Sequence, residues 1–157
     1  AADSLNADWL AWSLSVAGDA AAKLDPVQAA SFYSRSLELT ESTQVRAALV
    51  DVLLADNRAD DADHVLDDGA DALPLNIRRM IVAKRLGRDR EEVRIRAADH
   101  EFRHWIADND WLHAREMARF YLDVVERPAL ARRLAKINLK MQREPEDLLL
   151  ASRTGAI

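Results

Sequence analysis

Residues 100–104 read His-Glu-Phe-Arg-His and fit the H-E-x-x-H pattern of zinc-dependent peptidases. On a helix, His100 and His104 lie one turn apart on the same face, so that two imidazoles could hold one zinc ion. Glu101 would then act as the general base that activates a zinc-bound water. A third protein ligand is needed, and Asp110 is the candidate. The pattern raises the hypothesis of a zinc-binding protein or a zinc metallopeptidase.

The surroundings of this motif favour a different interpretation. Asp99 and Arg103 place charges around and within it, whereas the metal-binding helices of such peptidases are usually uncharged there. Ala107 stands where the aspartate-ligated variants turn at a glycine. His100 also falls on a regular spacing of large side chains, so we expect a structural histidine that packs between helices. Metal binding by His100, His104 and Asp110 is kept as the alternative.

The remaining sequence lacks the parts of other catalytic sites. The chain has no cysteine, which removes thiol nucleophiles, disulfides and thiolate zinc sites. It shows no glycine-rich phosphate loop, no serine nucleophile elbow and no cluster of catalytic carboxylates. His64 and His113 have no catalytic partners near them in the sequence. We therefore expect a protein that is not an enzyme and that uses no cofactor.

The size and composition of the chain are those of a folded domain. Its 157 residues are 49% apolar and 31% charged, with four glycines and four prolines, which predicts one helix-rich domain over residues 1–157. That domain could be a piece of a longer protein. A net charge of -5 argues against a nucleic-acid partner. We expect no membrane insertion and no signal peptide, which leaves the cytoplasm and the periplasm as the expected locations.

Helix signals recur along the whole chain, and no stretch alternates between apolar and polar residues as a strand would. Asp25 before Pro26 marks a helix start, Asp89 and Glu92 form a second capping box, and Gly87 suits a left-handed helix stop. The fold class expected is all-α. The predicted helices span residues 8–18, 26–39, 43–56, 59–71, 75–86, 90–108, 111–125, 128–142 and 146–154.

Corresponding residues return about every 34 positions, which indicates repeated helical pairs. A small residue lets the second helix of a pair lie close to the first, and a large residue three or four positions later fills the gap beside it. The small residues are Ala29, Ala62, Ala97 and Ala131. The large residues are Phe32, Leu66, His100 and Leu134. The residues that open the first helices of successive pairs are Trp9, Thr43, Ile77 and Trp111.

The tryptophans could in principle form a platform on which a ligand stacks. Their helical spacings and their positions near repeat boundaries instead favour packing between helical pairs. We therefore expect core positions for Trp9, Trp12, Trp105 and Trp111.

The period and these residue types resemble the tetratricopeptide repeat family (TPR). The clearest unit begins at Thr43 and carries Leu49, Leu53, Ala62, Leu66, Gly69 and Pro74 at the spacing of the family. The stretch from His113 to Pro145 is also similar to the closing segment of bacterial tetratricopeptide proteins, which suggests a bacterial source. The resemblance implies a right-handed α-solenoid of about four helical hairpins with a C-terminal capping helix.

The resemblance also implies a concave groove, lined by the first helices, that holds a protein or peptide. At helical spacing, Arg78, Arg85 and Arg88 share a face, and Arg115 and Arg119 lie one turn apart. Converging guanidinium groups favour an acidic or phosphorylated segment. The alternative is that these arginines are solvated and paired with the aspartates of residues 60–71. The predicted groove residues are Gln44, Asp51, Arg78, Arg85, Arg88, Arg115 and Arg119.

The function expected from these observations is a non-catalytic protein-binding module or assembly adaptor. Besides the zinc hypothesis, one further alternative is a structural solenoid whose open ends self-associate. In that case the apolar face around Leu10 and Trp12 would meet another repeat.

Overall fold

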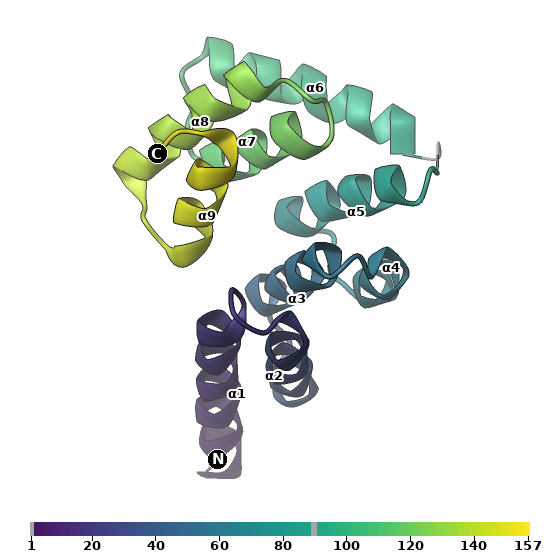
Figure 1. Cartoon of the computed structure of the whole chain (residues 1–157), viewed down its shortest axis with the longest axis vertical. Helices are drawn as coiled ribbons and strands as arrows, with labels where there is room; N and C mark the ends of the chain where they lie inside the picture. The colour runs from purple at the N-terminus through teal and green to yellow at the C-terminus, as the bar shows by residue number, and fades with distance from the viewer. Residues whose placement is uncertain (1, 89–90) are drawn as a thin grey trace. The chain divides into compact units, whose positions relative to one another are not determined.

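The computed structural model describes residues 2–88 and 91–157 of the chain, with side chains from residue 5 onward (Figure 1). Within these residues the chain forms nine α-helices and no strand, which confirms the all-α prediction for them. The helices group into two compact units, residues 1–86 and 87–157, and the expectation of one domain stays a prediction. No helix of the described residues is long and apolar enough to cross a membrane.

Unit 1 is built from helical pairs that are neighbours in sequence. The helix α1 packs along α2, α2 along α3, and α3 along α4, while α5 contacts both α3 and α4 (Figure 1). Short connections between these helices make antiparallel neighbours. The bounds are α1 (Ala2–Ala21), α2 (Pro26–Leu39), α3 (Thr43–Ala55), α4 (Ala59–Asp67) and α5 (Leu73–Arg85).

Unit 2 holds the remaining four helices. The helix α7 packs on α8, and α9 packs on both. The helix α6 joins this group through Phe102, whose ring centroid lies 5.1 Å from that of Phe120 and 6.5 Å from that of Tyr121. This pairing of neighbours is compatible with helical repeats, and the solenoid stays a prediction. The bounds are α6 (Glu92–Ala107), α7 (Ala114–Asp123), α8 (Pro128–Met141) and α9 (Pro145–Thr154).

The helix ends follow local signals. The side chain of Asp25 accepts a hydrogen bond of 3.0 Å from the amide of Gln28, as expected for the cap of α2. Gly87 follows α5 with a φ of 65°, which confirms the predicted left-handed stop. Asn57 and Asn109 take the same conformation after α3 and α6. The predicted capping box that begins at Asp89 lies outside the described residues.

The alanine and large-residue spacing describes the packing of α4 and α8 but not that of α6, and in α2 it holds only for the alanine, because Phe32 is half-buried and its neighbour Tyr33 is the buried large residue. Ala29, Ala62 and Ala131 are fully buried, whereas Ala97 is exposed. The expected packed position of His100 is wrong as well, because its side chain is exposed. The reason is that α6 turns the larger apolar side chain of Phe102 toward the core of unit 2, which places the position two residues earlier on the outside.

The close approach of α1 and α2 depends on Gly18, which faces the ring of Tyr33. A Cβ atom on Gly18 would lie 2.5, 2.7 and 2.9 Å from three ring atoms. The ring is anchored, because the Tyr33 hydroxyl donates a hydrogen bond of 2.8 Å to Asp19. Unit 1 therefore has no room for a side chain at this crossing.

Gly18→Ala is expected to destabilise unit 1 by about 1–2 kcal/mol, because overpacking outweighs the better helix propensity of alanine. The melting temperature followed by circular dichroism should fall by several degrees. In a Tyr33→Leu background, which removes the ring, the same change should cost less. An equal cost in both backgrounds would show that the ring contact is not the cause.

Candidate functional site

The two histidines of the zinc-like motif lie side by side on α6. Their Nε2 atoms are 3.2 Å apart, and their ring centroids are 4.6 Å apart at an interplanar angle of 77°. Both rings are exposed. Hence His100 and His104 share one face of the helix, as the motif predicts.

The third ligand is not brought to this pair. Asp110 lies beyond the end of α6, and its carboxylate accepts a hydrogen bond of 3.1 Å from the amide of Leu112. Across residues 2–88 and 91–157, no cluster of three or more His, Asp or Glu side chains has the geometry to hold a metal ion. The proposed three-ligand peptidase site with Asp110 is therefore not assembled in the described part of the chain.

The charges that interrupt the motif serve the packing of α6. Asp99 pairs with Arg103 at 2.8 Å, one turn along the same helix, and accepts a hydrogen bond of 3.0 Å from the Tyr121 hydroxyl of α7. Burial, reinforced by the bond to Asp99, raises the pKa of Tyr121 to about 12. The side of α6 next to the histidine pair is thus joined to α7 by the Asp99 carboxylate, which binds both Arg103 and Tyr121.

Two of the predicted groove residues, Asp51 and Arg78, bind each other inside unit 1. The Arg78 side chain is 1% exposed, and its Nε and Nη2 atoms donate to the two carboxylate oxygens of Asp51 at 3.0 and 2.7 Å. It also donates to the carbonyls of Ala47 and Pro74. The partner is Asp51 of α3 rather than the aspartates of residues 60–71, because α5 packs against α3. Arg78 therefore links two helices, and its guanidinium does not face solvent.

The other groove candidates of unit 1 are exposed. Gln44 lies in the first turn of α3 and Arg85 in the last turn of α5. Arg88, three residues beyond Arg85, is half-buried and belongs to unit 2. Among the predicted groove arginines of unit 1, Arg85 is therefore the exposed one, and it could bind an acidic group from solvent.

Sequence reasoning missed the role of Arg79, the neighbour of Arg78. Its guanidinium donates to the carbonyls of Leu66, Gly69 and Ala70 at 2.9, 2.7 and 3.3 Å, where α4 ends. A cation at a helix C-terminus satisfies carbonyls that have no partner within the helix. No local sequence signal identifies this role, because it depends on how α5 packs on α4.

In unit 2, Arg115 is held by carboxylates around the start of α9. Its Nε and Nη2 atoms donate to Asp147 at 2.6 and 2.9 Å, and further ion pairs join it to Glu144 and Glu146. Asn138 of α8 donates to the same Asp147 carboxylate at 2.6 Å. This Arg115–Asp147 cluster connects three helices, so most of the hydrogen-bonding capacity of Arg115 is used within the unit.

The electrostatics of the cluster favour the charged forms. Burial alone would raise the pKa of Asp147, but the hydrogen bonds from Arg115 and Asn138 outweigh it and hold that pKa below its ordinary value. Burial likewise opposes the charge of Arg115, and the bonds to Asp147 and its acidic neighbours hold the Arg115 pKa above the ordinary value. Arg119, one turn further along α7, is also buried. The cluster acts as a structural junction of unit 2.

The most unusual surface of unit 1 lies on α1. Trp9 is 64% and Trp12 58% exposed, and Leu5 and Val16 are exposed with them. Steps of four, three and four residues place these four side chains on one side of the helix, which we call the apolar stripe of α1. The two indole rings contact each other edge to face, with centroids 5.5 Å apart. The expectation that Trp9 and Trp12 are core residues is wrong.

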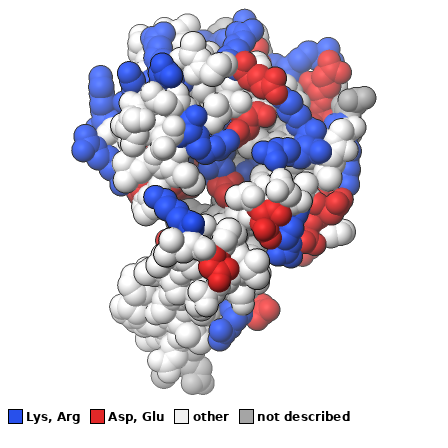
Figure 2. All heavy atoms as spheres, viewed as in Figure 1, with Lys and Arg blue, Asp and Glu red and all other residues white. Residues whose placement is uncertain are grey.

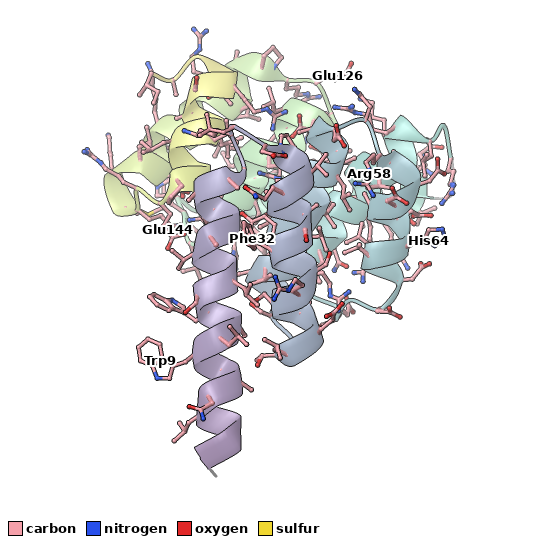
Figure 3. All side chains as sticks on the ribbon, turned by 60° about the horizontal axis from the view of Figure 1, so that its bottom comes forward. Trp9, Phe32, Arg58, His64, Glu126 and Glu144 are labelled. Carbon is pink, nitrogen blue, oxygen red and sulfur yellow. The ribbon has the colours of Figure 1, made fainter. Side chains whose placement is uncertain are left out.

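The reason lies in the opposite face of α1, which carries Ala11, Leu14 and Gly18 and packs on α2. The small residues Ala11 and Gly18 allow the close approach, and the large indoles stay outside. In Figure 2 the surface over α1 is almost entirely uncharged. Figure 3 shows Trp9 projecting away from α2.

The two charged side chains within residues 5–21 have partners on α2 or just beyond it. Asp8 accepts a hydrogen bond of 3.0 Å from the Thr40 hydroxyl, and Asp19 accepts the bond from Tyr33. The apolar stripe therefore carries no charge of its own.

A shallow open depression of about 460 Å³ lies between α2, α3 and α4. Arg58, at its edge, pairs with Asp61 at 2.7 Å, and His64 lies 4.0 Å from Asp67 (Figure 3). The ionisable side chains at the depression thus lie in pairs within α4 or next to its start, which is typical of a solvated surface.

The chain matches no protein-family model, and it has no significant match among curated proteins or solved structures. The tetratricopeptide resemblance and the function that it implies therefore stay predictions.

Proposed function

We propose that this chain is a non-catalytic protein-binding module that binds an apolar helix of a partner protein on the apolar stripe of α1. The observation that carries the proposal is the exposure of Trp9 and Trp12 together with Leu5 and Val16 on one helix face. Tryptophan is among the residues that contribute most to binding at protein interfaces. Exposed, contiguous apolar side chains on a folded unit are typical of such interfaces.

The spacing of the stripe suits a helix better than a small molecule. From Leu5 to Val16 the stripe covers 11 helical steps, about 17 Å along the helix axis. Its residues follow the alternating three- and four-residue steps of a two-helix seam. A small ligand would instead need a cavity that encloses most of its surface. Because the stripe is uncharged, the partner helix should present an apolar face of matching spacing.

Within each unit, the binding of an acidic segment by the predicted groove arginines has less support than the binding of an apolar helix by the stripe. Arg78 and Arg115 already bind carboxylates, and Arg119 is buried. Arg85 of α5 is the exposed member in unit 1, so its substitution tests whether an acidic segment contributes. Binding through the apolar stripe and binding through Arg85 thus predict different outcomes of the same experiment.

The test is affinity capture from bacterial lysate, comparing the wild type with a Trp9→Ala/Trp12→Ala variant. We expect the variant to lose the partner, because each tryptophan at the centre of an interface contributes about 2 kcal/mol, or about thirtyfold in affinity. Val27→Ala, which removes an exposed apolar residue of α2, is the matched control. Both tryptophans are exposed, so circular dichroism should show an unchanged fold.

Arg85→Glu separates the two modes. Loss of the partner with this variant alone would transfer the proposal from the stripe to an acidic segment. Capture of the same proteins by the tryptophan variant and the wild type would contradict the stripe as the binding surface. The mass of the purified chain in solution identifies a second copy as the partner if the wild type is dimeric and the tryptophan variant monomeric.

A further inference from the structure

We propose that His100 and His104 form a two-histidine binding site for a divalent transition-metal ion, such as Cu²⁺ or Zn²⁺, on the exposed face of α6. Two protein nitrogens would hold the ion, and water or a group from another molecule would complete its coordination. The site is independent of the apolar stripe of α1, and it needs neither Asp110 nor a peptidase activity.

The distance between the two nitrogens fits shared coordination. Imidazole nitrogens bind zinc at about 2.0–2.1 Å, so two of them at a tetrahedral angle are about 3.3–3.4 Å apart. At the right angle of a square-planar copper site, bonds of similar length give about 2.9 Å. The Nε2 atoms of His100 and His104 are 3.2 Å apart, between these two values. In the metal-free chain this contact is a hydrogen bond between the two rings, and an ion would replace its proton after the rings turn toward a common point.

The helix holds the two rings in this arrangement. Both residues lie within α6, with His104 in its last turn, so the helical backbone sets their separation at one turn. Both side chains are exposed, which lets a hydrated ion reach the nitrogens. Binding thus requires only the ordering of two side chains that already face each other.

The neighbouring charges do not oppose a cation at this place. Arg103 pairs with Asp99 at 2.8 Å, and Arg96 pairs with Glu92 at 3.4 Å, each one turn apart on α6. Both arginines therefore have a carboxylate beside them that offsets their charge. Glu101, next to His100, adds a further negative charge to this exposed surface. The local balance favours an added positive ion.

The expected strength follows from the number of ligands. Structural zinc sites with four protein ligands bind very tightly, and a site with two should bind with a dissociation constant of about 1–100 µM. Copper should bind more tightly than zinc, because affinity for nitrogen ligands rises toward Cu²⁺. An ion that joins two residues one turn apart should also stabilise α6 against unfolding.

The experiment is calorimetric titration of Cu²⁺ alone, and of Zn²⁺ alone, into the whole chain without a histidine tag. We expect one ion per chain at the predicted affinity. His100→Ala and His104→Ala should each weaken binding at least tenfold, because either change leaves a single imidazole ligand. His64→Ala removes an exposed histidine of α4 and should leave binding unchanged.

Nuclear magnetic resonance of the imidazole nitrogens provides a second readout on the wild type. Addition of Zn²⁺ should shift the signals of His100 and His104 together and leave those of His64 and His113 in place. The proposal is overturned if the wild type binds neither ion below about 1 mM, if the substitutions at His100 and His104 leave the affinity unchanged, or if other histidine signals respond instead.

Discussion

Asp147→Ala is expected to destabilise unit 2 by about 3–5 kcal/mol, because it removes the carboxylate that joins α7, α8 and α9. The Asp147 side chain is 0% exposed and accepts hydrogen bonds from Arg115, Asn138 and the amide of Glu144. Its loss leaves a largely buried guanidinium and a buried amide without their common acceptor. The measurement is the urea midpoint of unfolding followed by circular dichroism.

Glu101→Ala is the surface control for this experiment. Glu101 is exposed on α6, and its substitution should change the free energy of unfolding by less than about 0.5 kcal/mol. A loss at Asp147 no larger than that of the control would show that the cluster contributes little to stability.

The same carboxylate should make the stability of unit 2 depend on pH. The pKa of Asp147 is lower in the folded chain than its ordinary value of 3.8, so folding favours the ionised form. Its contribution is complete above the unfolded pKa and is lost as the pH falls through the lower folded pKa. The stability difference between the wild type and Asp147→Asn should therefore stay constant above about pH 5 and shrink below about pH 4.

Asp51→Ala should have the second large effect, a loss of about 3 kcal/mol in unit 1. The change removes the carboxylate partner of the Arg78 guanidinium, which is nearly inaccessible to water. The Asp51 side chain is 24% exposed, so solvent can enter and the loss should lie near the lower end of the range for buried ion pairs. Chemical denaturation of the whole chain gives the free energy of unfolding.

A double variant distinguishes the cost of an unpaired charge from the value of the ion pair. Asp51→Leu with Arg78→Met replaces both partners by apolar side chains and should recover most of the stability, because no charge is then left buried. Gln44→Ala, at an exposed position of the same helix, is the control. If the double variant is as unstable as Asp51→Ala, the loss does not come from an unpaired arginine.

These two ion pairs also bear on function. Residues predicted to line a groove, Asp51, Arg78 and Arg115, hold helices together within their own units. Substituting them would therefore affect folding before it affects any partner. Trp9, Trp12 and Arg85 are exposed, so their substitutions test binding with less effect on stability.

The helices themselves could be read from local signals. The prediction placed a helix where each of the nine described helices lies, because proline, capping side chains and glycine act within a few residues of a helix end. The bounds differ most at α1, predicted over 8–18 and observed over Ala2–Ala21, and at α4, predicted over 59–71 and observed over Ala59–Asp67. A smaller difference, at the start of α7, has a local cause. The helix α7 starts at Ala114 rather than residue 111, since the carboxylate of Asp110 binds the amide of Leu112 in the preceding turn.

Side-chain partners were much harder to predict. Both faces of α1 carry apolar residues, so the sequence does not indicate which face packs on α2 and which stays exposed. In α6, a repeat spacing placed His100 in the core, whereas the structure buries Phe102 there. A difference of two positions turns a helical side chain to the opposite side, so a small error of register reverses buried and exposed residues.

The sequence alone determined that the chain is helical, where its helices end, and that His100 and His104 share one helix face. These features depend on neighbours within a turn or two. Only the tertiary structure decided that Arg78 pairs with Asp51, that Arg115 meets Asp147, and that the tryptophans of α1 face outward. Such pairings join residues about 30 positions apart, and their geometry arises from how whole helices pack, which no local pattern contains.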